Sequence, residues 1–305
     1  MRICSLLPGV TETLYQLGME DDIVAVSDDC DFPNEVRQKP IVSKSTLSGK
    51  NYTPAEIHAL VESHKHKGFG IHDLDVKILK EINPDLIFTQ ELCEVCAVPY
   101  SQVLGAAKVL EQRPKIVSVE PITIEDILEN ILLIGQLTCK RERAAHFVSD
   151  LTRRIDFVKS KAKEAHAKPR VLDLEWTDPP MAGGHWMPEM IEMAGGEDGF
   201  AKAGGPTVKL DWQKISACQP EVVIVTPCNH TLEESLADAK ALGKTAQWHN
   251  LRAVTRREVY AANSKWYFSR SGPGLVTGLE ILAEIIHPEL FEGLAPAGSY
   301  SRVSV

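Results

Sequence analysis

Short runs of apolar residues alternate along the chain with longer stretches in which apolar positions recur every three or four residues. The short runs predict strands, and the longer stretches predict helices. Helices placed between consecutive strands are typical of parallel, doubly wound sheets, so we expect an α/β fold. Seven strands are expected, at Arg2–Leu7, Ile23–Ser27, Asp85–Thr89, Lys115–Val119, Arg170–Glu175, Glu221–Thr226 and Glu258–Ala262.

One segment, Ile124–His166, is unusual because it contains no glycine or proline after Gly135. Its apolar residues recur at helical spacing, with Cys139-Lys140 as the expected break. The remaining helix of about 25 residues, at ~1.5 Å each, is long enough to span a small domain. We interpret the segment as a rigid helix that joins two α/β halves. A long helix packed inside one domain is the alternative.

These segments divide the chain into four parts. We expect an N-terminal α/β lobe over residues 1–123, a connecting helical backbone over 124–167 and a C-terminal α/β lobe over 168–288, with a ligand cleft between the lobes. A length of 305 residues is more than one compact domain usually has, which agrees with two lobes. Residues 289–305 contain proline, glycine and several serines, and we expect a loosely ordered tail.

The composition excludes some partners and suggests a compartment. A formal charge of −9 does not favour nucleic-acid binding. Seven cysteines, an odd number, are not typical of a secreted disulfide framework. Met1 leads directly into the first apolar run, without the longer apolar core of a secretory signal. We therefore expect a cytoplasmic location for the chain as written, and a periplasmic one if the natural N-terminus is longer.

Chemically distinctive residues follow the predicted strands. In an open parallel sheet, loops and helix N-termini converge at the carboxyl ends of the strands, so ligands bind there. Three of the five tryptophans lie in these loops, and a ligand cleft explains aromatic side chains in polar loops. The candidate ligand-binding residues are Asp29, Cys30, Glu91, Trp176, His185, Trp186, Trp266, Tyr267 and Arg270.

Two cysteines after the third strand have a spacing that suggests chemistry. Cys93 and Cys96 form a CxxC segment, which suits half of a zinc site or a redox pair. A complete metal site needs two further ligands, for which Cys30 and His185 are the candidates. Thiolates select zinc, copper(I) or cobalt. Metal or ligand coordination, a redox disulfide and buried unreactive thiols all remain open.

Several polar residues have two interpretations. His185 can ligate a metal or a corrin cobalt, or it can contact the N-terminus of the following helix. Arg270 precedes a helix N-terminus, where a basic group suits an anionic ligand group, and a structural salt bridge explains it equally well. The histidines of the polar stretch Tyr52–Lys67, with His72 beyond it, invite a metal site. We favour a solvated helix there.

The order and spacing of several segments resemble those of a known family. ICSLLPGVTETLYQLG at 3–18, followed by IVAVSDDCDFP at 23–33, looks like the opening of class III periplasmic binding proteins. DPPMAGGHWMPEMIEMAGGEDGF at 178–200 is similar to the second lobe of the cobalamin-binding members, which are substrate-binding proteins of ABC importers. The resemblance extends over most of the chain and implies two α/β lobes joined by one long helix.

The sequence also departs from this family. Where the cobalamin-binding members carry one glutamate per lobe that docks on the transporter, this chain has Lys77 and Gln213. An aromatic residue of their first-lobe cleft falls near Asp29. These departures weigh against docking on an ABC permease. A corrinoid ligand stays compatible with the chain, since the three loop tryptophans can stack against a corrin edge.

No catalytic motif changes this interpretation. The sequence has no G-x-S-x-G elbow, P-loop, G-x-G-x-x-G or HExxH segment. We therefore expect a non-catalytic protein that binds a cobalamin-like corrinoid or another metal chelate. The alternative is a cytoplasmic protein that binds zinc or another transition metal directly through Cys and His, or an enzyme of metal insertion or thiol chemistry.

Overall fold

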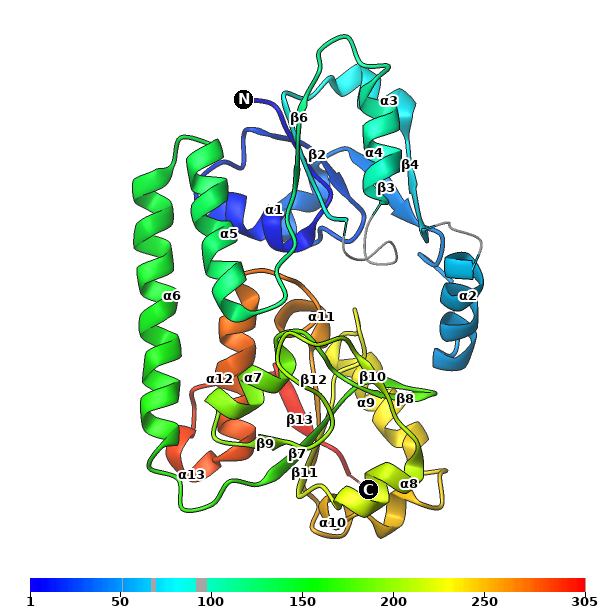
Figure 1. Ribbon diagram of the computed structural model, residues 1–305, viewed down its shortest axis with the longest axis vertical. Coiled ribbons are helices and arrows are strands. Elements are labelled where there is room, and N and C mark those ends of the chain that lie inside the picture. The colour runs from blue at the N-terminus through cyan, green and yellow to red at the C-terminus, as the bar shows by residue number, and fades with distance from the viewer. Residues whose placement is uncertain (51, 67–69, 92–97, 305) are drawn as a thin grey trace. The chain divides into compact units, whose positions relative to one another are not determined.

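The computed structural model describes residues 1–50, 52–66, 70–91 and 98–304 (Figure 1). The chain forms two compact units, and each is built on its own β-sheet. The predicted α/β fold with two sheets is confirmed. Unit 1 comprises Met1–Pro121, Asp126–Val148 and Ser271–Pro273, and unit 2 comprises Ile122–Glu125, Ser149–Arg270 and Gly274–Val305.

The sheet of unit 1 has six strands in the order β4-β3-β2-β1-β5-β6. All neighbours are parallel except β4, which runs antiparallel to β3. Four of these strands were predicted, whereas β3 and β4 were missed because they are short and partly polar. The strands are β1 (Ile3–Ser5), β2 (Ile23–Ser27), β3 (Ile41–Ser45), β4 (His72–Leu74), β5 (Leu86–Thr89) and β6 (Lys115–Ser118).

Helices cover the first sheet. Helix α1 begins with Pro8, whose fixed φ suits a first helical turn, and Gly18 follows its end with a left-handed φ of +68°. Helix α2 buries none of its described side chains, as a solvated helix does. The elements are α1 (Pro8–Gln16), η1 (Asn34–Gln38), α2 (Pro54–His66), α3 (Val76–Ile82) and α4 (Tyr100–Ala107).

The long helical segment forms two helices, α5 (Ile124–Leu137) and α6 (Arg141–Ala162). They are separated at Cys139, which adopts a left-handed φ of 57°. The two helices approach closely at this turn, because a Cβ on Gly135 would lie 2.3 Å from the Cβ of Ala144. The boundary between the units falls inside α6, after Val148.

The sheet of unit 2 follows the path β10-β8-β7-β11-β12-β13, with β9 beside β7. Strands β7, β11 and β12 are parallel to one another and correspond to the three predicted strands of this half. Strands β8 and β13 are antiparallel to their neighbours. The strands are β7 (Arg170–Thr177), β8 (Pro180–Ala182), β9 (Glu197–Asp198), β10 (Val208–Lys209), β11 (Val222–Val225), β12 (Val259–Ala262) and β13 (Tyr300–Arg302).

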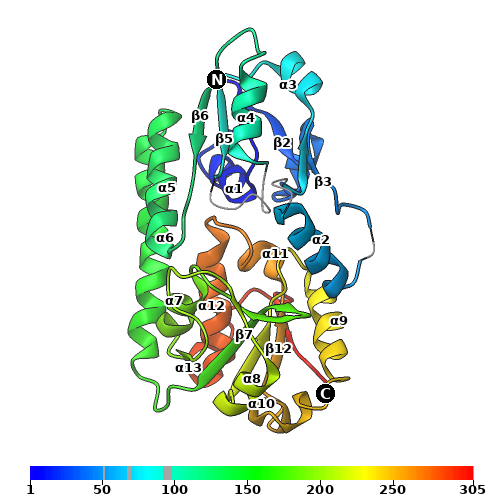
Figure 2. The ribbon, with the colours of Figure 1, turned by 45° about the vertical axis from the view of Figure 1, so that its right-hand side comes forward.

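Helices lie on both faces of this sheet, α7 and α12 on one and α8, α9 and α10 on the other (Figures 1 and 2). Leu172 and Val223 belong to the core cluster under α8, α9 and α10. On the other face, Val171 approaches Gly196 beside α7 and α12. The elements are α7 (Met187–Met193), α8 (Trp212–Cys218), α9 (Leu232–Leu242), η2 (Trp248–Asn250), α10 (Arg252–Thr255), α11 (Ser264–Tyr267) and α12 (Gly274–Ile286).

The C-terminal tail is structured, which differs from our expectation for residues 289–305. Helix α13 (Pro288–Phe291) buries Phe291, and β13 pairs with β12. Proline, glycine and serine in the tail indicated loose order, but pairing with an existing strand satisfies the backbone of β13 whatever its composition. Among the described residues, no helix has the length and apolarity needed to span a membrane.

Each unit contains the same short helix before a central strand. Helix α3 follows Asp75, whose carboxylate accepts the backbone N–H of Lys77 at 3.0 Å, and it ends at Asn83 with φ 45°. Helix α8 follows Asp211, a second aspartate cap, and ends at Gln219 with φ 48°. Both helices have seven residues, and a proline follows each left-handed residue. The aspartate caps satisfy backbone donors that the first turn cannot satisfy itself.

Candidate functional site

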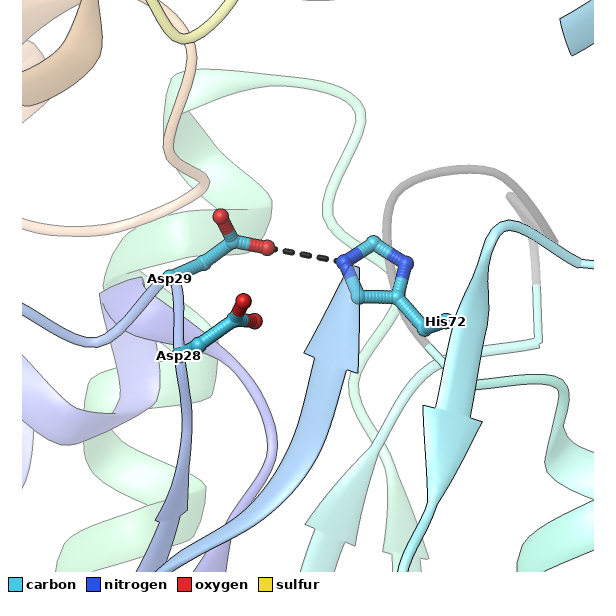
Figure 3. Close-up of side chains that lie close together, drawn as sticks. All are labelled: Asp28, Asp29 and His72. Atoms are coloured by element: carbon cyan, nitrogen blue, oxygen red, sulfur yellow. Dashed lines mark hydrogen bonds and ion pairs between the residues drawn. The ribbon is translucent and has the colours of Figure 1, made fainter. Parts of the chain in front are cut away.

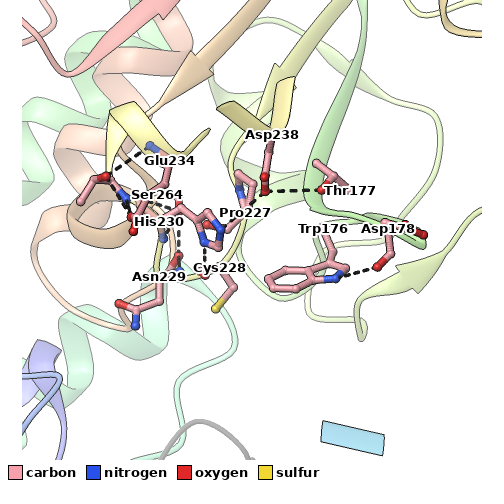
Figure 4. Close-up of polar contacts among 12 residues, drawn as sticks. Trp176, Thr177, Asp178, Pro227, Cys228, Asn229, His230, Glu234, Asp238 and Ser264 are labelled. Carbon is pink, nitrogen blue, oxygen red and sulfur yellow. Dashed lines mark hydrogen bonds and ion pairs between the residues drawn. The ribbon is translucent and has the colours of Figure 1, made fainter. Parts of the chain in front are cut away.

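The parallel strands β7, β11 and β12 end at one edge of the sheet of unit 2, so the loops that follow them lie near one another. Trp176 is the second-last residue of β7 and is half-buried. Its Nε1–H donates to the carbonyl oxygen of Asp178 at 3.1 Å. Its ring meets that of His230 edge to face, with centroids 5.8 Å apart and planes at 88° (Figure 4). Both contacts fix the orientation of the indole.

His230 is itself held from two sides. Its Nδ1 lies 2.9 Å from the carbonyl oxygen of Cys228, and because a carbonyl only accepts, Nδ1 carries a proton. Its Nε2 lies 3.5 Å from Oδ2 of Asp238 on α9. Burial raises the pKa of Asp238, and the neighbouring His230 and the hydroxyl of Thr177 oppose that rise. The loop after β11 is therefore anchored to α9.

Hydrogen bonds join the loops after β11 and β12. Asn229, with a left-handed φ of 62°, donates its backbone N–H to Oγ of Ser269 at 2.9 Å. The backbone N–H of Lys265 donates to the carbonyl oxygen of His230 at 2.9 Å. The buried hydroxyl of Ser264 accepts the N–H of His230 at 3.3 Å. These contacts make the two loops one structural element.

His185 and Trp186 lie immediately before α7, where they were predicted to form part of a site. The Nε1–H of Trp186 donates to the carbonyl oxygen of Phe268 at 2.9 Å, which ties this segment to the loop after β12. His185 adopts a left-handed φ of 52°, and its backbone N–H donates to Gly205 at 2.6 Å. The two rings lie 5.7 Å apart with a tilt of 39°.

The remaining predicted residues of this half lie on or after α11. The rings of Trp266 and Tyr267 are 6.4 Å apart and nearly perpendicular, at 89°. Asn263 caps the helix, and its side-chain oxygen accepts the backbone N–H of Trp266. Arg270 is only 5% exposed. Burial of Arg270 is compatible with both interpretations given above, a structural salt bridge and a contact with an anionic ligand group.

Two acidic side chains of β7 lie beneath these loops, and the sequence analysis did not single them out. Asp173 is 2% exposed and accepts a hydrogen bond from the hydroxyl of Thr226. Burial raises the pKa of Asp173 well above the usual range of aspartate. Burial also raises the pKa of Glu175, which accepts the Thr207 hydroxyl at 2.7 Å. The sequence feature that could have revealed these residues is the presence of two carboxylates at alternate positions of an otherwise apolar strand.

In unit 1, the predicted residue Asp29 lies in a cluster with Asp28 and His72 (Figure 3). The Oδ2 of Asp29 is 2.8 Å from Nε2 of His72 on β4. The carboxylate of Asp28 accepts the backbone N–H of Ser45, at 3.1 and 3.2 Å from its two oxygens. Burial, and secondarily the charge of Asp29, raise the pKa of Asp28. The sequence analysis grouped His72 with the histidines of the solvated helix and did not predict a site there.

The predicted thiolate metal set is not assembled within one unit. Cys30 is 3% exposed, and its Sγ accepts a hydrogen bond from the hydroxyl of Thr11 at 3.1 Å. It belongs to unit 1, whereas His185 belongs to unit 2. Cys93 and Cys96 lie outside the described residues. An exposed cysteine that the predicted set omitted, Cys228, lies beside His230 in the loop after β11.

The other predicted positions lie on the surface of their units. Glu91 is exposed after β5, and its backbone N–H donates to the carboxylate of Glu120. Lys77 and Gln213, which replace the expected docking carboxylates, are exposed in the first turns of α3 and α8. Each is the second residue after its capping aspartate, so the two positions are equivalent in the two units.

The sequence matches a family model over most of its length. Residues 3–265 match the model described as "Periplasmic binding protein". The chain belongs to this family. The resemblance found in the sequence is thereby confirmed.

Named relatives cover nearly the whole chain. The uncharacterized ABC transporter substrate-binding lipoprotein YvrC of Bacillus subtilis is 24% identical over 302 residues, which are 95% of this chain and 81% of that protein. The vitamin B12-binding protein of Vibrio parahaemolyticus is 24% identical over 270 residues, 87% of this chain and 82% of the relative.

Solved structures share the fold. The periplasmic vitamin B12 binding protein BtuF of Vibrio cholerae has a TM-score of 0.69 at 20% identity, covering 94% of this chain and 96% of that one. A periplasmic heme-binding protein from Pseudomonas aeruginosa has a TM-score of 0.73 at 17% identity, covering 100% and 99%.

These comparisons correct the expected compartment. The cytoplasmic location predicted from the sequence is wrong, because the family is that of periplasmic binding proteins and the similar proteins are named as a lipoprotein and as periplasmic proteins. They point to a place outside the cytoplasm. The expectation depended on the first few residues of the chain, which carry no information on the loops and sheets that define the family.

Proposed function

We propose that this protein is the substrate-binding component of an ABC importer and that it binds a corrinoid or a similar planar metal chelate. Membership of the periplasmic binding protein family supports a binding role. Relatives named for vitamin B12 and similar structures named for heme support a macrocyclic chelate as the ligand class. The same names do not favour the alternative of an ion bound directly by Cys and His.

One observation carries the choice of ligand: the aromatic edge of unit 2, which we define as Trp176, Trp186 and Trp266. The indole N–H groups of Trp176 and Trp186 are committed to backbone carbonyls of Asp178 and Phe268. The ring faces therefore supply the area for stacking, and their orientation is fixed before a ligand arrives. Half-buried, preorganised aromatic rings suit a broad ligand with apolar edges.

The experiment is a titration of the purified protein with cobalamin, cobinamide and hemin, followed by tryptophan fluorescence. Replacing Trp176, Trp186 or Trp266 by Ala should each cost about 1–3 kcal/mol of binding free energy, which is about ten- to a hundredfold in Kd. Trp212→Ala is the matched control, because Trp212 lies on α8 against Trp248 and outside the aromatic edge.

The three chelates also separate the members of the ligand class. Binding of cobalamin and cobinamide but not hemin would identify a corrinoid, and the reverse would identify a porphyrin. Failure of all three to bind the folded wild-type protein would contradict the proposal. Equal losses in Trp212→Ala and the three site variants would contradict the role of the aromatic edge.

A further inference from the structure

The cluster of Asp28, Asp29 and His72 combines three metal-ligating side chains in unit 1. One ligand atom from each lies within 4.8 Å of the other two. Asp28 and Asp29 follow β2 at its carboxyl end, and His72 begins β4. Among the described residues this is the group of three or more His, Cys, Asp or Glu side chains close enough to share an ion.

The imidazole is held in place by strand pairing. His72 lies opposite Ser45 in the antiparallel β3–β4 ladder, and Ser45 also donates its backbone N–H to Asp28. The same residue therefore sets the position of the histidine and of one carboxylate. The ring of His72 is 4% exposed, and its Nε2 points at Asp29 (Figure 3).

Three buried polar atoms without partners lie on or next to the paired strands β3 and β4. The Nδ1 of His72 is buried and has no hydrogen-bond partner, and the same is true of the hydroxyls of Ser43 and Thr46 on and next to β3. Buried polar atoms without partners are rare in folded proteins, and each calls for an explanation. Three such atoms on or next to one strand pair show that this region has more polar groups than its internal hydrogen bonds use.

We propose that Asp28, Asp29 and His72 form a binding site for a divalent transition-metal cation such as zinc. One imidazole nitrogen and two carboxylate oxygens are donors that zinc accepts at about 2.0–2.2 Å. Tetrahedral donors at that distance are about 3.4 Å apart, so the ligand atoms, which lie within 4.8 Å of one another, need to move closer by about 1 Å to share an ion. Three protein ligands leave a coordination position open for water or another group.

The charges favour a dication. Asp28 and Asp29 are adjacent in sequence, and their carboxylates share one partly buried place beside a nearly buried ring. Two like charges brought together in partly buried surroundings repel each other, and a bound dication offsets that repulsion.

This site shares no residue with the aromatic edge that carries the proposed chelate site. Its three ligands belong to unit 1, whereas the aromatic edge belongs to unit 2. It also differs from the thiolate set of the sequence analysis, because the neighbouring thiol of Cys30 is directed to Thr11.

The test is equilibrium dialysis of the full chain against zinc, with metal analysis of the protein. The wild type is expected to bind one equivalent. His72→Ala and Asp29→Asn should each weaken zinc binding by at least about tenfold, since even outer partners of metal ligands are worth about 10–100-fold. His64→Ala, on the solvated helix α2, is the matched histidine control. The double variant Cys93→Ser/Cys96→Ser should retain the zinc.

A second measurement keeps the proposal testable if His72→Ala fails to fold. Cobalt(II) bound by the wild type should show visible bands without the thiolate-to-cobalt charge-transfer band, since the proposed donors are nitrogen and oxygen. Zinc lost only from the double cysteine variant, a thiolate band with cobalt, or no zinc binding by wild type would overturn the proposal. Zinc binding by Trp176→Ala and Trp186→Ala should match that of wild type, so the two proposals can fail separately.

Discussion

The rings of Trp176 and His230 meet edge to face at 88°, with their centroids 5.8 Å apart. This contact joins the end of β7 to the loop after β11, two segments more than fifty residues apart in the chain. Cys228 and Asp238 fix the position of the His230 ring, and the His230 ring in turn fixes the orientation of the Trp176 indole. The orientation of one candidate ligand-binding ring thus depends on a residue outside the aromatic edge.

His230→Ala should weaken chelate binding although His230 is not one of the three tryptophans. An aromatic pair contributes about 0.5–1.5 kcal/mol, so Kd should rise about two- to tenfold. His249→Ala is the matched control, because this exposed histidine contacts the carbonyl oxygen of Gly243 outside the site. Isothermal titration of both variants measures the difference. Unchanged affinity in His230→Ala would show that Trp176 needs no support from the imidazole.

Arg154 and Glu280 should stabilise unit 2 as a pair. Arg154 on α6 donates to both carboxylate oxygens of Glu280 on α12, at 2.8 and 2.6 Å, and the Glu280 side chain is 10% exposed. Arg154→Met leaves a nearly buried carboxylate without its partner, which should cost about 1–3 kcal/mol of unfolding free energy. The double variant with Glu280→Met should recover part of that loss.

The exposed pair of Arg153 and Asp150 on α6 provides the control for this cycle. Arg153→Met should change the free energy of unfolding by about 0–0.5 kcal/mol, since exposed ion pairs contribute little. Urea unfolding of wild type, Arg154→Met, Glu280→Met and their double variant gives the coupling energy, with Arg153→Met measured beside them. A double variant that is as unstable as the sum of the single variants would exclude coupling.

Two helical glycines should respond oppositely to alanine. A Cβ on Gly9 in α1 would lie 2.3 Å from the carbonyl oxygen of Ser271, so Gly9→Ala should destabilise the protein by about 1–3 kcal/mol. Gly105 in α4 is exposed and has no atom within 4 Å of the corresponding position. Gly105→Ala should stabilise by about 0.5–1 kcal/mol, because alanine is the better helix former. A urea midpoint of Gly9→Ala at or above that of wild type would refute the packing assigned to Gly9.

Asp173 should make stability depend on pH. Burial raises its folded-state pKa above the unfolded value of about 3.9, so the neutral acid is favoured in the folded protein. Its contribution to stability is fully present below about pH 4 and is lost as pH rises through the folded-state pKa. Asp173→Asn should therefore gain stability relative to wild type as pH rises, by at most about 1.4 kcal/mol per pH unit.

Urea unfolding at several pH values between 4 and 8 tests this. Thr226→Val is the informative second variant, because it keeps the acid but removes the hydroxyl that stabilises its charged form. Its stability should continue to fall to higher pH than that of wild type. A constant difference between Asp173→Asn and wild type would show that the carboxyl does not titrate in this range.

The sequence pattern predicted the central strands of both sheets and missed their edges. Buried parallel strands such as β5 and β11 are continuous apolar runs, which are visible without any partner. Strand β4 is only His72–Leu74, and pairing with β3 makes it a strand. Local composition does not encode that pairing, nor the pairing of β13 with β12 that gives the tail its structure.

The sequence predicted those parts of the candidate site that lie directly after a predicted strand. The rule that loops gather at the carboxyl ends of parallel strands pointed to Trp176, which the structure has as the second-last residue of β7. The rule gives no information on which side chains meet. Asp29 and His72 are separated by 43 positions, and they come together through the unpredicted β3–β4 ladder. The spacing of histidines along the chain therefore did not single out His72, which the structure brings next to Asp29.

Helices α3 and α8 have the same length but different sequences, so the fold requires a fixed number of residues at this place in each unit. The two helices have no identical residue at matching positions, yet eight positions separate Asp75 from Asn83 and Asp211 from Gln219. A single inserted or deleted residue there would shift β5 or β11 by one position and turn every side chain of the strand to the opposite face. Substitutions within these helices should therefore be tolerated far better than changes in their length.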